Sequence, residues 1–196
     1  MPRPEYRCGE TEYNDRIDRD WWRTLVKRVF EGLGPMDFEA FFEEVYALFA
    51  GASVWQLYPE VPDVLAGLRA AGLKLAIVSN FDSRLTPVCK GLDLFMAVDT
   101  VVIASEAGAA KPDALIFRSA LEHFGVPPEH ALHVGDSWEE DALGAIGAGL
   151  HAVHLQRSGI EARPILEHGV PVIRDLSGLA GLIIGGAETP SAAARR

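Results

Sequence analysis

The chain has 196 residues, of which 48% are hydrophobic and 23% are charged, and its formal net charge is −10. This balance is typical of a globular protein and excludes a disordered or fibrous one. A chain of this length can bury one good core and a small appendage. The acidic charge argues against binding to nucleic acid, which needs a basic face. No apolar run reaches the roughly 18 residues that span a bilayer, so no membrane partner is expected.

The start of the chain and its cysteines bear on the cellular compartment. The first 20 residues are polar and contain no apolar segment typical of a secretory signal. The two cysteines, Cys8 and Cys89, have neither the spacing of a metal site nor that of a disulfide framework. We therefore expect both thiols to be reduced and the protein to be cytoplasmic.

The N-terminal quarter predicts a polar arm followed by two helices. Residues 1–17 show little apolar periodicity and are expected to form a flexible arm. A helix capped by Asp18 or Asp20 is expected to follow, and a second helix is expected from Asp37 to Gly51. Both helices carry large apolar residues on one face, so another part of the molecule must cover this helical hairpin.

From Tyr58 onward, short apolar runs alternate with amphipathic helical patterns. Strands are expected at residues 73–79, 100–104, 131–135, 151–155 and 171–174. Helices are expected at residues 59–71, 83–91, 112–124, 138–148 and 177–184. Strands separated by helices predict an α/β fold with a Rossmann-like parallel sheet. The last residues, 185–196, are small and polar and are expected to be disordered.

Three of the expected strands end in polar residues, at the edge where open parallel sheets bind their ligands. The first strand ends in Ser79-Asn80, a hydroxyl and an amide that precede a helix N-terminus and suit an anionic oxygen. A simple turn before a helix cap explains the same two residues equally well. The second strand end is followed by Glu106 and Lys111. The Lys111 ammonium would point into the crevice, although a solvated lysine beside a helix cap is the alternative.

The third strand end carries carboxylates. Asp136 follows the strand directly, and Asp141 lies five residues further on. A carboxylate at the end of a buried strand is costly unless it is paired or binds a cation, and two of them form an oxygen-rich site suited to Mg²⁺. A helix N-cap accounts for Ser137 but accounts for Asp136 less well. The six histidines show no ligand spacing, so neither a zinc nor a general-base role is expected for them.

Taken together, three segments resemble the haloacid dehalogenase-like hydrolase superfamily, in its subfamily with a helical cap. They are SNFDSR at 79–84, KPDALIF at 111–117 and GDSWEEDALGA at 135–145. The resemblance implies an α/β core over residues 56–184 and a partial helical cap over residues 18–55, where Trp21-Trp22 matches a branch of the family with a WW pair. The arm at 1–17 and the tail at 185–196 complete the expected organisation.

The resemblance also implies roles for individual residues. These are phosphoryl-oxygen contacts for Ser79 and Asn80, charge stabilisation for Lys111, direct Mg²⁺ ligation for Asp136, an outer supporting position for Asp141, and a further site position for Glu106.

One departure from the family pattern concerns the nucleophile. Members of the superfamily open with a strand ending in DxDx(T/V), whose first Asp forms an aspartyl-phosphate and whose second Asp is the general acid/base. This sequence lacks that motif, and its one DxD, Asp18-Arg19-Asp20, follows no buried strand and is better explained as a helix cap. We therefore expect a core without its first strand, which the family places between the strands that end at Ser79 and Gly135. The exposed edges predict a homodimer or a marginally stable monomer.

The leading interpretation is a Mg²⁺-dependent phosphatase for a small phosphorylated metabolite, inactive in this form because the nucleophile motif is absent. A non-catalytic relic, or a phosphate-binding regulatory module, is the alternative from another functional class. A haloacid dehalogenase is the second alternative. That chemistry needs no metal, so Asp136 and Asp141 favour the phosphatase.

Overall fold

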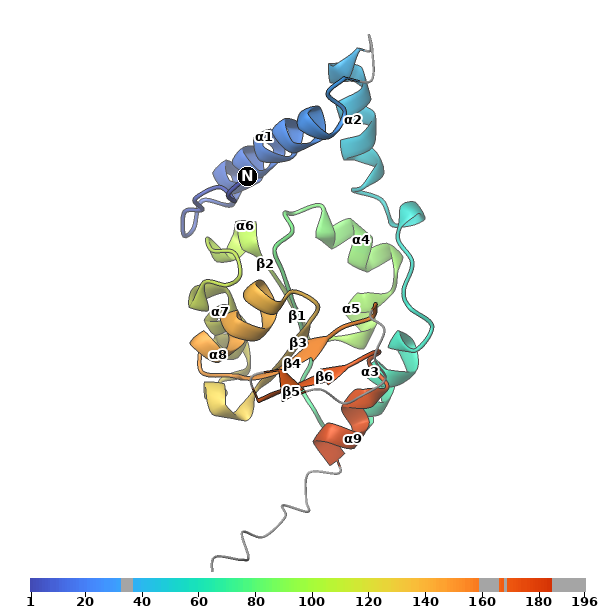
Figure 1. Ribbon diagram of the computed structural model, residues 1–196, viewed down its shortest axis with the longest axis vertical. Helices are drawn as coiled ribbons and strands as arrows, with labels where there is room; N and C mark the ends of the chain where they lie inside the picture. The colour runs from blue at the N-terminus through green and yellow to red at the C-terminus, as the bar shows by residue number, and fades with distance from the viewer. Residues whose placement is uncertain (33–36, 159–165, 168, 185–196) are drawn as a thin grey trace, which may run out of the picture.

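The computed structural model describes residues 1–32, 37–158, 166–167 and 169–184. An α/β core carries two helices, α1 (Thr11–Val29) and α2 (Phe38–Leu48), beyond one end of its strands (Figure 1). Asp37 caps α2 by accepting a hydrogen bond from the backbone N–H of Ala40. The helix was expected from Asp37 to Gly51 and ends earlier, at Leu48. The expected tail at 185–196 lies outside the described residues.

The structure differs from the expected arm over residues 1–17, because residues 11–17 are helical. Helix α1 already begins at Thr11, so Asp18 lies inside the helix and does not cap it. The fully buried Asn14 side chain bonds both backbone groups of Arg7 and also donates to the carbonyl of Ser105 in the core. These contacts are made by polar side chains, so apolar periodicity could not reveal them.

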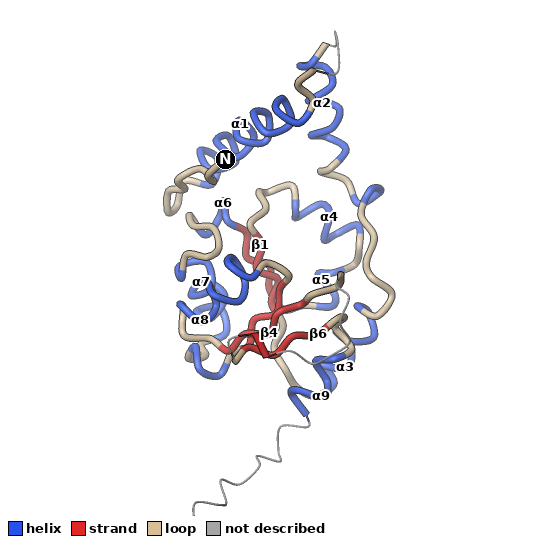
Figure 2. Tube along the Cα trace, in the orientation of Figure 1, coloured by secondary structure: helices blue, strands red, loops and turns tan. Residues whose placement is uncertain are grey.

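The strands form two hydrogen-bonded sheets (Figure 2). The first sheet pairs two parallel strands, β1 (Ala76–Ser79) and β2 (Thr100–Ile103). The second has the order β3-β4-β6-β5 and consists of β3 (Leu132–Gly135), β4 (His151–Leu155), β6 (Val170–Ile173) and β5 (Leu166–Glu167). The pairs β3-β4 and β4-β6 are parallel, which confirms the predicted fold class, whereas β5 is antiparallel to β6. A strand of two residues is too short for a periodic pattern, so the sequence did not predict β5.

Helices cover both faces of these strands. The longer ones are α3 (Val61–Ala70), α4 (Leu85–Gly91), α7 (Ala114–Phe124) and α9 (Gly178–Ile184). The shorter ones are η1 (Ala52–Val54), α5 (Leu94–Ala97), α6 (Ala104–Ala107), η2 (Pro128–His130), the π-helical turn η3 (Trp138–Leu143) and α8 (Gly144–Gly147). Ile116 and Phe117 of α7 pack with Ala145 of α8 in one buried cluster, and Leu68 of α3 packs with Leu179 of α9 in another.

The edges of β1 and β3 lie where the resemblance places the opening strand. In the part of the chain that the structure describes, no strand pairing joins β1 to β3. Both strands are only partly buried, and Leu132 at the start of β3 is 38% exposed, whereas Ala152, Val153 and His154 in β4 are buried. Unpaired strand edges inside a core are costly, so this interval is suited to a further strand. Within the same described residues, no helix is both long and apolar enough to cross a bilayer.

Candidate functional site

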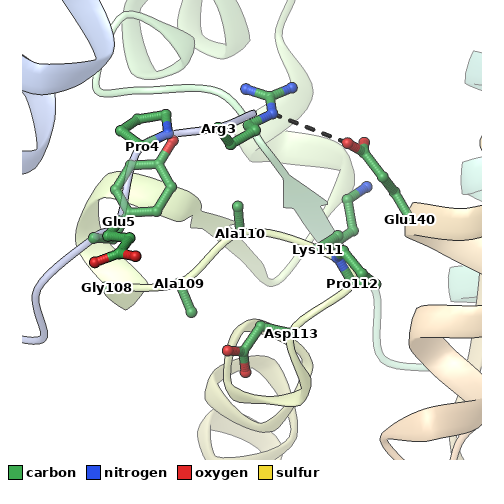
Figure 3. A pocket seen from close by; sticks show the side chains of 11 residues that line it. Arg3, Pro4, Glu5, Gly108, Ala109, Ala110, Lys111, Pro112, Asp113 and Glu140 are labelled. Carbon is green, nitrogen blue, oxygen red and sulfur yellow. Dashed lines mark ion pairs between the residues drawn. The ribbon is translucent and has the colours of Figure 1, made fainter. Parts of the chain in front are cut away.

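A cavity of about 470 Å³ lies beside Lys111 (Figure 3). One wall is the N-terminal segment at residues 3–6, a second is the loop at 108–113 that follows α6, and Glu140 of η3 completes the lining. The loop brings Lys111 to this cavity, and β3 and η3 bring Asp141 to Lys111. The carboxyl ends of parallel strands are where such a fold binds ligands.

A buried ion pair between Lys111 and Asp141 lies at the centre of the site. The Lys111 Nζ atom donates to Asp141 Oδ1 at 2.6 Å, and the two side chains are 11% and 5% exposed. His133 Nε2 lies 2.9 Å from the same carboxylate oxygen, and the backbone N–H of Ser137 donates to Oδ2 at 3.0 Å. Asp141 therefore fixes the position of the Lys111 ammonium.

The charge state of Asp141 follows from these partners. Burial alone would raise the pKa of this carboxyl, but the hydrogen bond with His133, the positive charge of Lys111 and the bonds from Lys111 and Ser137 outweigh burial and lower the pKa below its ordinary value. Asp141 is consequently ionised at neutral pH and keeps Lys111 as its counter-ion.

The local backbone explains how Asp141 reaches this position. Ser137 caps η3 by accepting from the N–H of Glu140, and the wide π-helical turn that follows carries Asp141 back beneath β3. The carboxylate occupies the space beside Gly135, where a Cβ atom would lie 2.1 Å from Asp141 Cγ. Only glycine fits at this position.

We expect Gly135→Ala to displace Asp141 and to lower the free energy of unfolding by about 1–3 kcal/mol, because the added methyl overlaps a buried charged group. Gly147→Ala in α8 is the matched control, since a Cβ there meets nothing within 4 Å and alanine favours a helix. Urea denaturation of both variants measures the difference. Equal stability of the two variants would show that Asp141 is not confined by Gly135.

Asn80 bonds the backbone of Lys111 through both the oxygen and the nitrogen of its side-chain amide. Its Oδ1 accepts from the Lys111 N–H at 2.6 Å and its Nδ2 donates to the Lys111 carbonyl at 3.0 Å. This pair of bonds joins the end of β1 to the lysine loop, so the structure gives Asn80 a positioning role. The neighbouring Ser79 hydroxyl accepts from the N–H of Phe81 at 3.2 Å. Phosphoryl contacts from these two residues stay predictions.

Two other expected site residues do not contact the buried ion pair of Lys111 and Asp141. Asp136 is exposed, not buried as its place after a strand suggested, and Glu106 is exposed on α6. Both oxygens of Asp141 are bonded within the protein. Among the described residues, no group of three His, Cys, Asp or Glu side chains is placed to hold a metal ion. These residues therefore do not form a complete Mg²⁺ site by themselves.

The structure adds two site residues that the sequence analysis passed over. His133 lies on β3 two residues before Gly135, and strand alternation places both on one face, which was the available signal. Its ring also packs edge-on against Phe117, with centroids 5.1 Å apart. Arg3 lines the cavity through the N-terminal segment, and no sequence pattern pointed to it.

Comparisons with known proteins agree with this geometry. The family model for haloacid dehalogenase-like hydrolases matches residues 7–149. The haloacid dehalogenase-like hydrolase domain-containing protein 3 of Bos taurus is 36% identical over 183 residues, which cover 92% of this chain and 71% of the relative. The mouse protein of the same name is 39% identical over 137 residues, and the chain spans 55% of its length.

Two further similarities concern phosphatases. A phosphoserine phosphatase of Thermus thermophilus is 40% identical over 120 residues, or 61% of this chain and 45% of the relative. A solved structure of a HAD phosphatase from Thermococcus onnurineus shares the fold, with a TM-score of 0.61 and 23% identity over 88% of this chain and 91% of that one. The matched family model, the bovine relative and the strand-end site together show that the chain belongs to the haloacid dehalogenase-like hydrolase family.

Proposed function

We propose that this chain forms the phosphate-binding core of a Mg²⁺-dependent phosphatase that acts on a small phosphorylated molecule. The observation that carries the proposal is the Lys111 ammonium, which Asp141 holds at the carboxyl ends of the strands beside a cavity. The printed names of relatives add support, since the Thermus relative is a phosphoserine phosphatase and a Methanothermobacter relative, 29% identical over 139 residues, is a glyceraldehyde 3-phosphate phosphatase.

The proposed role of Lys111 is electrostatic. Its ammonium has three N–H donors, and the bond to Asp141 uses one of them. The others can bind phosphoryl oxygens and offset the negative charge that grows on them during transfer. Asn80 keeps the lysine loop against the end of β1. The Ser79 hydroxyl accepts from the N–H of Phe81 and can donate its own hydrogen to a phosphoryl oxygen.

The proposed role of Asp136 is metal binding. It is an exposed carboxylate at the end of β3, and bound Mg²⁺ would neutralise phosphate charge there. In the family the remaining protein oxygens come from the DxDx(T/V) motif, which this sequence lacks. We therefore propose that the 196 residues bind Mg²⁺ only weakly.

Neither member of the buried ion pair is suited to attack a phosphate. Asp141 is bonded at both oxygens, and Lys111 is its protonated partner. We propose that the 196-residue chain binds a phosphate without hydrolysing it, and that the nucleophile belongs to a strand between β1 and β3. A regulatory phosphate-binding module would bind phosphate in the same way, and a dehalogenase would not need Asp136. The cytoplasmic location and the homodimer stay predictions, the latter measurable by light scattering.

The proposal is tested by titrating inorganic phosphate into the 196-residue chain in a calorimeter. We expect Lys111→Ala to weaken binding by about tenfold or more, because it removes a charge-assisted contact from a partly desolvated site. Lys90→Ala, which removes an exposed lysine on α4, is the matched control and should leave the affinity unchanged. Phosphate binding that is insensitive to Lys111→Ala, or no binding at all, would contradict the proposed site.

A further inference from the structure

The cavity beside Lys111 has one wall that the core does not supply. Residues 3–6 form it, and the segment is fixed on both sides. Before it, the indole N–H of Trp21 donates to the carbonyl of Pro2 at 2.6 Å. After it, the backbone of Cys8 packs on Gly108, whose φ of +72° and absent Cβ allow the approach, since a Cβ would lie 2.6 Å from Cys8 Cα. The wall is therefore held in a defined place.

This wall carries Arg3, which faces Glu140 across the cavity (Figure 3). Arg3 Nε and Glu140 Oε1 are 3.9 Å apart, too far for a hydrogen bond, and the two side chains are 31% and 37% exposed. Arg3 Nη1 donates to the carbonyl of Asn80 at 3.0 Å, and the guanidinium lies 5.2 Å from the ring centroid of Trp21. A guanidinium has five N–H donors, so this anchored group keeps donors for a ligand.

The charges around the cavity restrict the class of ligand. The basic side chains of the lining are those of Arg3 and Lys111, and the acidic ones are those of Glu5, Asp113 and Glu140. A ligand with only anionic groups would meet repulsion from the carboxylates, and a cation would meet repulsion from the bases. A ligand that carries both a positive and a negative group can pair with the basic and with the acidic side chains of the lining. Arg3 and Glu140, a loose pair of opposite charges, are complementary to the adjacent carboxylate and ammonium of an amino acid.

We propose that Arg3 and Glu140 bind the α-carboxylate and the α-ammonium of a phosphorylated amino acid whose phosphate lies at Lys111. This inference rests on the proposed phosphate site and adds the substrate class. Arg3 can bind a carboxylate through two parallel N–H donors, and Glu140 accepts hydrogen bonds from the ammonium. The ligand exchanges the long Arg3–Glu140 contact for two short charge-assisted ones, while Arg3 keeps its bond to Asn80.

Three phosphate esters distinguish the contributions of the carboxylate and of the ammonium to binding. O-phosphoserine carries both, 3-phosphoglycerate has a hydroxyl in place of the ammonium, and phosphoethanolamine lacks the carboxylate. We expect the 196-residue chain to bind O-phosphoserine about ten- to a hundredfold more tightly than either analogue in calorimetric titrations, because each analogue loses one charge-assisted contact. Equal affinities for all three esters would overturn the proposal.

Single substitutions assign each contact. Arg3→Ala should reduce the affinity for O-phosphoserine to that for phosphoethanolamine, while the affinity for phosphoethanolamine itself stays unchanged and shows that the site is still folded. Glu140→Gln should reduce the affinity for O-phosphoserine to that for 3-phosphoglycerate. If Arg3→Ala weakens all three esters alike, Arg3 only supports the wall and the proposal is wrong. If no ester binds, or if Lys111→Ala leaves their binding unchanged, the phosphate site itself fails.

Discussion

Fusion of an upstream strand that ends in DxDx(T/V) is expected to convert the 196-residue chain from a polypeptide without phosphatase turnover into a Mg²⁺-dependent phosphatase. An aspartyl-phosphate forms only when a carboxylate lies in line with the phosphorus, roughly 3 Å away. The carboxylate bonded to Lys111 is that of Asp141, and both of its oxygens are already bonded within the protein. The unpaired edges of β1 and β3 offer the place for the added strand. We expect turnover of p-nitrophenyl phosphate to rise by on the order of 10³-fold or more.

The controls for this fusion separate chemistry from folding. A fused strand in which both Asp residues are Asn should pair with the same edges and raise the melting temperature, but should give no turnover. In the active fusion, Lys111→Ala or Asp136→Ala should abolish turnover, and Lys90→Ala should not. If the unfused chain already hydrolyses the aryl phosphate and Asp136→Ala silences it, the account of the absent nucleophile is wrong. If the fusion stays inactive while phosphate still binds, a regulatory phosphate-binding module is the better reading.

Asp18→Asn is expected to remove a pH-dependent loss of stability. The Asp18 side chain is 1% exposed inside α1, and its Oδ2 atom is buried without a hydrogen-bond partner among the described residues. Burial raises the pKa of this carboxyl from 3.8 to about 6; the negative charges of Asp82 and Asp15 add to the rise, while the hydrogen bond from Tyr6 and the charge of Arg3 oppose it. The ionised form is therefore disfavoured in the folded protein.

The sign of the effect follows from linkage. A carboxyl whose folded pKa lies above its unfolded pKa contributes stability below about pH 4 and loses it as the pH rises through about 6. The full loss is about 3 kcal/mol at high pH. Roughly half of it falls between pH 5 and pH 8. We expect the stability of Asp18→Asn relative to the parent chain to increase by about 1.5 kcal/mol between these two pH values, as measured by urea denaturation.

Asp20→Asn is the matched control, because Asp20 lies on the same helix and is exposed. Its stability difference from the parent chain should be the same at pH 5 and pH 8. A pH-independent difference for Asp18→Asn as well would show that Asp18 does not carry a raised pKa in the folded protein.

The sequence by itself determined the class of fold and the family. Apolar runs alternating with helical patterns predicted β1 to β4 and β6, because buried strands and amphipathic helices have different periods. The three segments at 79–84, 111–117 and 135–145 identified the family that the matching model confirms. They also pointed to Lys111, whose role stays a prediction and which the structure places in the loop at 108–113 that follows β2 and α6.

The tertiary structure decided what lies around Lys111. Apolar periodicity does not reveal contacts made by polar side chains, so the sequence predicted a flexible arm over residues 1–17. In the structure Asn14 bonds the carbonyl of Ser105, and Arg3 lines the cavity. The resemblance to the family gave Asp136 and Asp141 different roles, but the sequence did not determine which groups surround each carboxylate. The π-helical turn, and the absence of a side chain at Gly135, allow Asp141 to bond Lys111 and His133. Asp136 stays exposed. Such choices depend on where backbone elements cross in space, and no local pattern records that.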